Sequence, residues 1–145
     1  MHTSPLALAA VLTGFATSAF ASDDPWALLA GIEIEEIDAQ GDYMVKKTYP
    51  AGIAQGAESF RITGYAVPLT LEPGAATQEI MLVSDMGNCP FCGSSEHSAT
   101  LQVELDRPVV LEEGAKVSVV GALELIDDPQ TWQAAIMRGA TLVEL

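Results

Sequence analysis

The chain has 145 residues, of which 20 are Asp or Glu and 6 are Lys or Arg, so its formal net charge is −14. This length suits a single domain, and a hydrophobic content of 49% is typical of a globular protein rather than a disordered one. The negative charge excludes a general nucleic-acid binder, which needs clustered Lys and Arg facing phosphates, and it opposes binding to an anionic membrane surface.

Residues 1–21 have the pattern of a secretory signal peptide. The run from Leu6 to Ala21 is almost entirely apolar or small, and it ends in Ala19-Phe20-Ala21, the small-x-small pattern that a signal peptidase cuts. The run is too short, and carries too little flanking charge, for a membrane span. We therefore expect export, a single β-rich domain over residues 22–145, and a soluble periplasmic protein.

The first part of that domain predicts a short helix and a hairpin. Residues 23–29 begin with an Asp cap, place Pro25 at the first helical position and continue with apolar residues. Residues 32–37 alternate between apolar and polar for most of their length, as a half-buried strand does. Turn residues at 39–42 then lead into a second strand over 43–49.

The remainder, after a loop at 50–56, consists of strand patterns separated by turns and loops, and no stretch carries three turns of helical periodicity. Gly121, inside the longest of these patterns, predicts a bulge or a sharp bend. Five short strands, one of them strongly bent, favour a small barrel like the oligonucleotide/oligosaccharide-binding (OB) fold, with a sandwich as the alternative. The strands are expected at 59–67, 79–83, 100–105, 116–125 and, at the end of the chain, 132–137 with 141–143.

The most distinctive chemistry lies in one short segment. Cys89 and Cys92 are three positions apart, so a turn can bring both sulfurs to one side of an ion, and His97 follows five positions later. Zinc prefers thiolate and imidazole ligands in a tetrahedron, so these residues predict a zinc site whose fourth place is left for a carboxylate or water. Copper(I) is the alternative metal if Met86 or Met81 joins the thiolates.

Two other interpretations of the cysteines stay open. In an oxidising compartment they can form a structural disulfide that stiffens a loop. They can also form a redox-active dithiol, since Cys89-Pro90-Phe91-Cys92 looks like a glutaredoxin-type active site. We expect no thioredoxin fold, because Gly93-Ser94-Ser95 follows where a helix would have to continue, and no βαβ pattern is visible.

The other side chains predict no catalysis. Trp26 and Trp132 are interpreted as packing residues. The sequence places no two carboxylates in the way that glycosidase chemistry needs. It also contains no nucleophile elbow whose serine His97 could activate. We therefore expect a non-enzymatic protein, with a thiol-disulfide oxidoreductase as the enzymatic alternative. The acidic pairs, interpreted as solvated charges in or beside turns, are Glu35-Glu36, Glu112-Glu113 and Asp127-Asp128.

Three motifs are combined in this chain, namely the strand residues 64–69 with the pattern Gly-aromatic-x-x-Pro-Leu, the pair Cys89 and Cys92, and the late strand residues 119–123 with the pattern Val-x-Gly-x-Leu. This combination resembles a family of small exported bacterial proteins of uncharacterised function, some of which accompany ABC-type transporters linked to zinc. The resemblance implies a periplasmic metal-handling accessory that would assist a membrane transporter or its periplasmic binding protein, with zinc as its only cofactor.

Overall fold

The computed structural model describes residues 24–39, 41–86 and 99–143. The expected signal peptide, and with it the expected start of the domain, lies outside these residues. The described part begins with a short helix, α1 (Pro25–Ala30), and then consists of strands. The strands are β1 (Glu33–Ala39), β2 (Asp42–Thr48), β3 (Ala57–Pro68), β4 (Thr77–Val83), β5 (Thr100–Val109), β6 (Ala115–Leu125) and β7 (Ala135–Val143).

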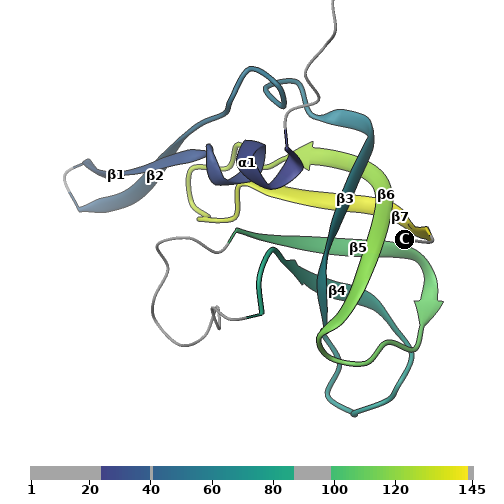
Figure 1. Cartoon of the computed structure of the whole chain (residues 1–145). Coiled ribbons are helices and arrows are strands. Elements are labelled where there is room, and N and C mark those ends of the chain that lie inside the picture. Colours follow the sequence, from purple (N-terminus) through teal and green to yellow (C-terminus); the bar gives the residue numbers. More distant parts are fainter. Residues whose placement is uncertain (1–23, 40, 87–98, 144–145) are drawn as a thin grey trace, which may run out of the picture.

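Five of the strands close into a barrel (Figure 1). Their order is β3-β4-β5-β7-β6, and β6 pairs back onto β3. Neighbouring strands are antiparallel except for β5 and β7, which run parallel. Numbered within the barrel, the order is therefore 1-2-3-5-4, the arrangement of an OB-like barrel. The predicted fold is confirmed, and the alternative sandwich is wrong.

The interior of the barrel is filled by side chains. Every second residue of a strand points inward, so the apolar–polar alternation that predicted the strands also builds the core. Because the interior is closely packed, surfaces available for binding lie on the outside of the barrel. Inward side chains that are at most 2% exposed are Ile62, Ala66, Ile80, Leu82, Leu101, Val103, Val119, Leu123, Met137 and Ala140.

Helix α1 packs against β3, and a glycine makes this close approach possible. The helix begins as predicted, since the Asp24 side chain accepts a hydrogen bond from the backbone N–H of Trp26 at 3.1 Å and Pro25 occupies the first turn. The indole Nε1 of Trp26 donates to the carbonyl oxygen of Thr63 at 2.6 Å. At Gly64, an added Cβ would lie only 2.7 Å from Cζ2 of the same indole. Only glycine therefore fits under the indole.

The strands β1 and β2 form a separate hairpin that projects from the barrel (Figure 1), as predicted. Their register pairs Ile34 with Lys47 and Glu36 with Val45, so these four side chains share one face of the hairpin, together with Tyr43. On this face Val45 and Lys47 are buried, which shows that it is packed against other parts of the molecule. Exposed residues of the opposite face are Glu33, Glu35, Ile37, Lys46 and Thr48.

Gly121 marks the predicted irregularity in β6. The register between β6 and β7 shifts between Val120 and Ala122, and a Cβ at Gly121 would lie 2.9 Å from the Cα of Ala140. The final strand differs from the prediction in two respects. It is one continuous strand, whereas two pieces at 132–137 and 141–143 were expected. β7 begins at Ala135 rather than at residue 132, because the preceding residues belong to a loop that packs on the hairpin.

Replacing Gly64 by alanine should destabilise the protein, because the new methyl group would overlap the Trp26 indole and the carbonyl oxygen of Val83. We expect the free energy of unfolding, measured by urea denaturation, to fall by about 2 kcal/mol. The control is Ser59→Ala, at an exposed position of the same strand, which should change this free energy by less than about 0.5 kcal/mol. Equal stabilities of the two variants would contradict the packing argument.

Candidate functional site

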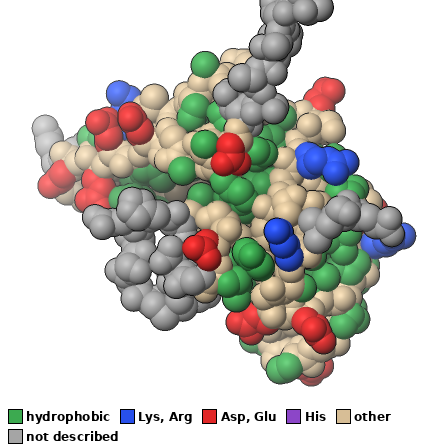
Figure 2. Space-filling view, viewed as in Figure 1, with side chains coloured by type: hydrophobic (Ala, Val, Ile, Leu, Met, Phe, Trp, Pro, Cys, Tyr) green, Lys and Arg blue, Asp and Glu red, His purple; other side chains and the backbone are tan. Residues whose placement is uncertain are grey.

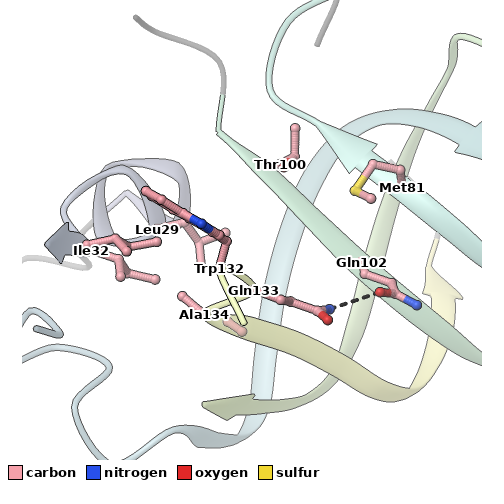
Figure 3. A pocket seen from close by; sticks show the side chains of 10 residues that line it. Leu29, Ile32, Met81, Thr100, Gln102, Trp132, Gln133 and Ala134 are labelled. Atoms are coloured by element: carbon pink, nitrogen blue, oxygen red, sulfur yellow. Dashed lines mark hydrogen bonds between the residues drawn. The ribbon is translucent and has the colours of Figure 1, made fainter. Parts of the chain in front are cut away.

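A hollow of about 470 Å³ lies where the hairpin, the helix and the barrel meet. Figure 3 shows Trp132 beside Leu29 on one side and Met81 and Gln102 on the other. OB folds bind ligands on the face of their second and third strands, here β4 and β5, beside the loop before the last strand. In this protein the loop before the last strand is residues 126–134, called the β6–β7 loop below. The hollow therefore lies on the face that OB folds usually use for binding. Its apolar lining consists of Leu29, Ile32, Ile34, Met81, Ala134 and Ala135.

A buried lysine holds the β6–β7 loop in place. Lys47 is 9% exposed, and its ammonium group donates hydrogen bonds to three carbonyl oxygens of the loop. The acceptors are Ile126 at 2.7 Å, Asp128 at 2.8 Å and Gln133 at 2.8 Å. All three ammonium donors are thereby used, so the buried charge is solvated by backbone dipoles instead of water. The hairpin thus fixes the loop that carries Trp132.

Tyr49, just after β2, supports the same loop. Its hydroxyl group lies 2.9 Å from the carbonyl oxygen of Ile126 and 3.1 Å from that of Ala134, and it donates to this pair. Burial raises the pKa of Tyr49 above its ordinary value of 10.0, and the negative charge of Asp127 raises it further. The neutral hydroxyl is therefore the form that the loop stabilises.

Trp132 is held at the surface of the loop and not inside the core. Its side chain is 48% exposed, although it is one of the large apolar residues. On the hairpin side, the backbone N–H of Val45 donates to the carbonyl oxygen of Pro129 at 2.8 Å. The pKa of Tyr43 is raised above its ordinary value, chiefly by partial desolvation. The neighbouring Trp132 lowers this pKa by a smaller amount, and the negative charge of Glu36 raises it. Trp132 therefore lies beside the hairpin, where it lines the hollow with Ile34, while one part of the indole stays accessible.

The polar part of the lining is centred on two amides. The Nε2 group of Gln133 donates to Oε1 of Gln102 at 2.9 Å, which ties the loop to β5 (Figure 3). Nε2 of Gln102 and Oε1 of Gln133 have no partner among the described residues. They can donate to a carbonyl group and accept from an N–H or O–H group of a ligand. Of the described residues that line the hollow, none is charged.

A second hollow, of about 500 Å³, lies between the β3–β4 and β5–β6 loops, away from the hairpin (Figure 1). Leu71 is fully exposed there and Val110 is 64% exposed, and the lining also includes Glu112 and Glu113. It is made by the tips of two loops and contains no amide pair like that of the first hollow. The first hollow is therefore the better candidate for a preformed binding site.

The predicted metal ligands, Cys89, Cys92 and His97, lie outside the described residues. The described strands do locate the two ends of their segment. Val83 pairs with Thr100 across β4 and β5, and Thr100 is also part of the lining of the first hollow. Within the described ranges there is no group of three or more His, Cys, Asp or Glu residues that could hold a metal ion.

Trp26 packs against the core, and Trp132 lies half exposed at the edge of the fold, where it lines the hollow. Both positions agree with the interpretation of these residues as core or edge packing residues. One interpretation from the sequence needs correction. The pair Glu35-Glu36 lies inside β1, not in or beside a turn, although both side chains are exposed as expected. Lys47 was not among the residues that the sequence singled out. The feature that indicates it is the alternation of the second strand, which places Lys47 on the same face as Tyr43 and Val45.

Comparison of the chain with protein-family models, curated proteins and solved structures finds no match. The assignment of function therefore depends on the residues and the geometry described above. Among the described residues, no helix is both long enough and apolar enough to cross a membrane.

Replacing Lys47 by methionine should release the β6–β7 loop. The substitution keeps most of the side-chain volume but removes three charge-assisted hydrogen bonds to carbonyl groups, so we expect a loss of about 3 kcal/mol in the free energy of unfolding. Amide hydrogen exchange at Val45, whose N–H binds the loop, should become faster. Lys46→Met is the matched control, because Lys46 is exposed on the other face of β2, and it should leave both measurements nearly unchanged. Slow exchange retained in Lys47→Met would contradict the assigned role.

The stability of the protein should fall at alkaline pH in a way that depends on Tyr49. Its pKa is raised in the folded state, so its stabilising effect is complete below pH 10.0, the ordinary pKa, and is lost as the pH rises toward the folded-state value. We expect Tyr49→Phe to lower the free energy of unfolding by about 1 kcal/mol at pH 7. Above pH 10.0 the stabilities of the two proteins should converge. Tyr43 is present in both the unmodified protein and Tyr49→Phe, so its titration cannot make their pH profiles differ. Parallel pH profiles of the two stabilities would therefore exclude a contribution of Tyr49.

Proposed function

We propose that this protein is an exported, non-enzymatic binding module that holds a transition-metal ion, with zinc as the expected metal, and assists a transport system. The proposed ligands are Cys89, Cys92 and His97. Two thiolates and one imidazole are the donor types that zinc prefers, and three protein ligands leave one coordination place open for exchange with a partner. The resemblance to exported proteins that accompany zinc-linked transporters supports the same assignment.

The observation that carries the proposal is that all three ligand-type residues fall in one connection between two paired strands. Val83 pairs with Thr100, and the backbone N–H of Ser84 donates to the carbonyl oxygen of Ala99 at 3.2 Å. The two ends of the connection are thus held side by side by the barrel. The entropy cost of bringing distant ligands together is therefore largely met by the fold.

The barrel favours binding over thiol-disulfide exchange of the glutaredoxin type. In that enzyme class the reactive thiol lies at the start of a helix within a βαβ arrangement. The strands before and after Cys89 and Cys92, β4 and β5, are antiparallel neighbours in a closed barrel, whereas the strands of a βαβ unit run parallel. A structural disulfide remains the second candidate, and the experiments below separate it from metal binding.

The overall charge is compatible with a cation-binding role. A net charge of −14 raises the local concentration of cations near the protein, although it provides no selectivity among them. Selectivity would come from the thiolates, since carboxylates alone favour calcium, magnesium or manganese.

Calorimetric titration of reduced protein with zinc tests the proposal. We expect one ion per chain, loss of tight binding in Cys89→Ser, and weaker but measurable binding in His97→Ala, because the thiolates supply most of the affinity. Ser94→Ala, a change in the same segment that removes no metal-ligand type, should bind as the unmodified protein does. Unchanged affinity in Cys89→Ser would refute the metal site.

Native mass spectrometry of protein purified without chelator or reductant separates metal binding from a disulfide. A mass increased by one metal ion, with both thiols open to alkylation after denaturation, would support the metal site. A metal-free mass lower by two protons would indicate a disulfide between Cys89 and Cys92 and would overturn the proposal for the protein in its own compartment.

A further inference from the structure

We propose that the hollow beside Trp132, together with the outer edge of β1, binds an extended, basic peptide segment that carries one bulky apolar side chain. The segment would belong to a partner protein. The metal proposal concerns other residues, so this inference stands or fails independently of it.

The hollow has the character of a pocket for an apolar side chain. Its volume of about 470 Å³ lies in the range of preformed ligand pockets, and most of its lining is aliphatic or aromatic. Trp132, at 48% exposure, offers apolar surface that the fold leaves in contact with water. The loop that carries Trp132 is anchored by the three hydrogen bonds of Lys47, so the pocket is rigid before a ligand arrives. A half-exposed, rigidly held tryptophan is a typical hot-spot residue.

The polar groups beside the hollow match a peptide backbone. The spare N–H of Gln102 and the spare carbonyl oxygen of Gln133 are a donor and an acceptor, and a peptide unit offers the complementary pair. Ile34 of β1 also lines the hollow. Among the described strands, β1 pairs with β2 alone, so no described strand occupies its other edge, and an extended segment can be added there. A segment added there alternates its side chains between the two faces, and one of them can enter the hollow next to Ile34.

The charges around the open edge indicate a basic partner. Figure 2 shows acidic side chains gathered over the hairpin, at the left of the view. They include Glu33, Glu35, Glu36 and Asp38, all of them exposed on β1 itself. The two lysines of β2 compensate for little of this charge, because the ammonium group of Lys47 is buried against carbonyl groups and only Lys46 is exposed. Lys or Arg residues on the added segment would pair with these carboxylates, whereas an acidic segment or a nucleic acid would be repelled.

Fluorescence anisotropy of labelled heptapeptides tests the proposal on the full-length protein, with EDTA present so that no metal contributes. The probe alternates lysine with valine and has phenylalanine at its centre. We expect it to bind with a dissociation constant in the micromolar range, and to bind several-fold more weakly when NaCl is raised from about 50 to about 500 mM. Replacing phenylalanine by alanine should weaken binding by about tenfold or more, and replacing every lysine by glutamate should abolish it.

Variants of the protein locate the site. Trp132→Ala should weaken binding of the phenylalanine peptide by about tenfold or more, and Gln102→Ala should weaken it by a smaller factor. Glu33→Gln combined with Glu35→Gln should weaken it chiefly at low salt. Leu71→Ala, at the fully exposed tip of the β3–β4 loop and away from the hairpin, is the matched control and should not change it. Urea denaturation of each variant checks that the fold is retained.

Three outcomes would overturn the proposal. The first is equal binding by Trp132→Ala and Leu71→Ala. The second is binding of the glutamate peptide as tightly as the lysine peptide. The third is Trp132-dependent binding of a neutral oligosaccharide such as chitotriose in the absence of any peptide binding, which would assign the hollow to carbohydrate.

Discussion

One ammonium group determines the shape of the binding face. Lys47 is buried and has three backbone carbonyl groups as its partners, so it can leave this environment only by breaking three charge-assisted hydrogen bonds. The bonds connect a hairpin that lies outside the barrel to the loop before the last strand. The barrel itself holds this loop through the bond from Gln133 to Gln102 of β5. The hairpin adds the three bonds of Lys47, and with Ile34 it contributes to the lining of the hollow.

The two proposed sites adjoin each other at the start of β5. Thr100 lines the hollow, and it also pairs with Val83 at the point where the segment with Cys89, Cys92 and His97 is joined to the barrel. A partner bound in the hollow would therefore lie beside the anchored end of the proposed metal-binding segment. This proximity is the arrangement that an accessory protein needs if metal exchange is to take place while the partner is bound.

The sequence predicted the parts of the fold that depend on local pattern. Alternating residues such as Leu101, Val103 and Leu105 identified strands because inward positions are apolar and outward positions are polar. Gly121 identified the irregular pairing because only glycine permits that approach of β7. The hollow could not be predicted in this way, since Lys47 and its carbonyl partners are distant in sequence and ordinary in type. The cysteine motif was conspicuous in the sequence but lies outside the described residues, so its proposed role depends on ligand chemistry and on the paired strands at the two ends of its connection.

The sequence separation of the Lys47 contacts has a consequence for folding. Its acceptors lie 79 to 86 residues further along the chain, whereas the hairpin that carries it is formed by neighbouring residues. Local pairing is fast, and contacts between distant residues must wait until the loops between them have closed. The hairpin can therefore form early, but its lysine gains its partners only when β6 and β7 have joined the barrel. A chain that has not completed its last strand lacks the hollow, so the hollow is a property of the finished barrel and not of its early intermediates.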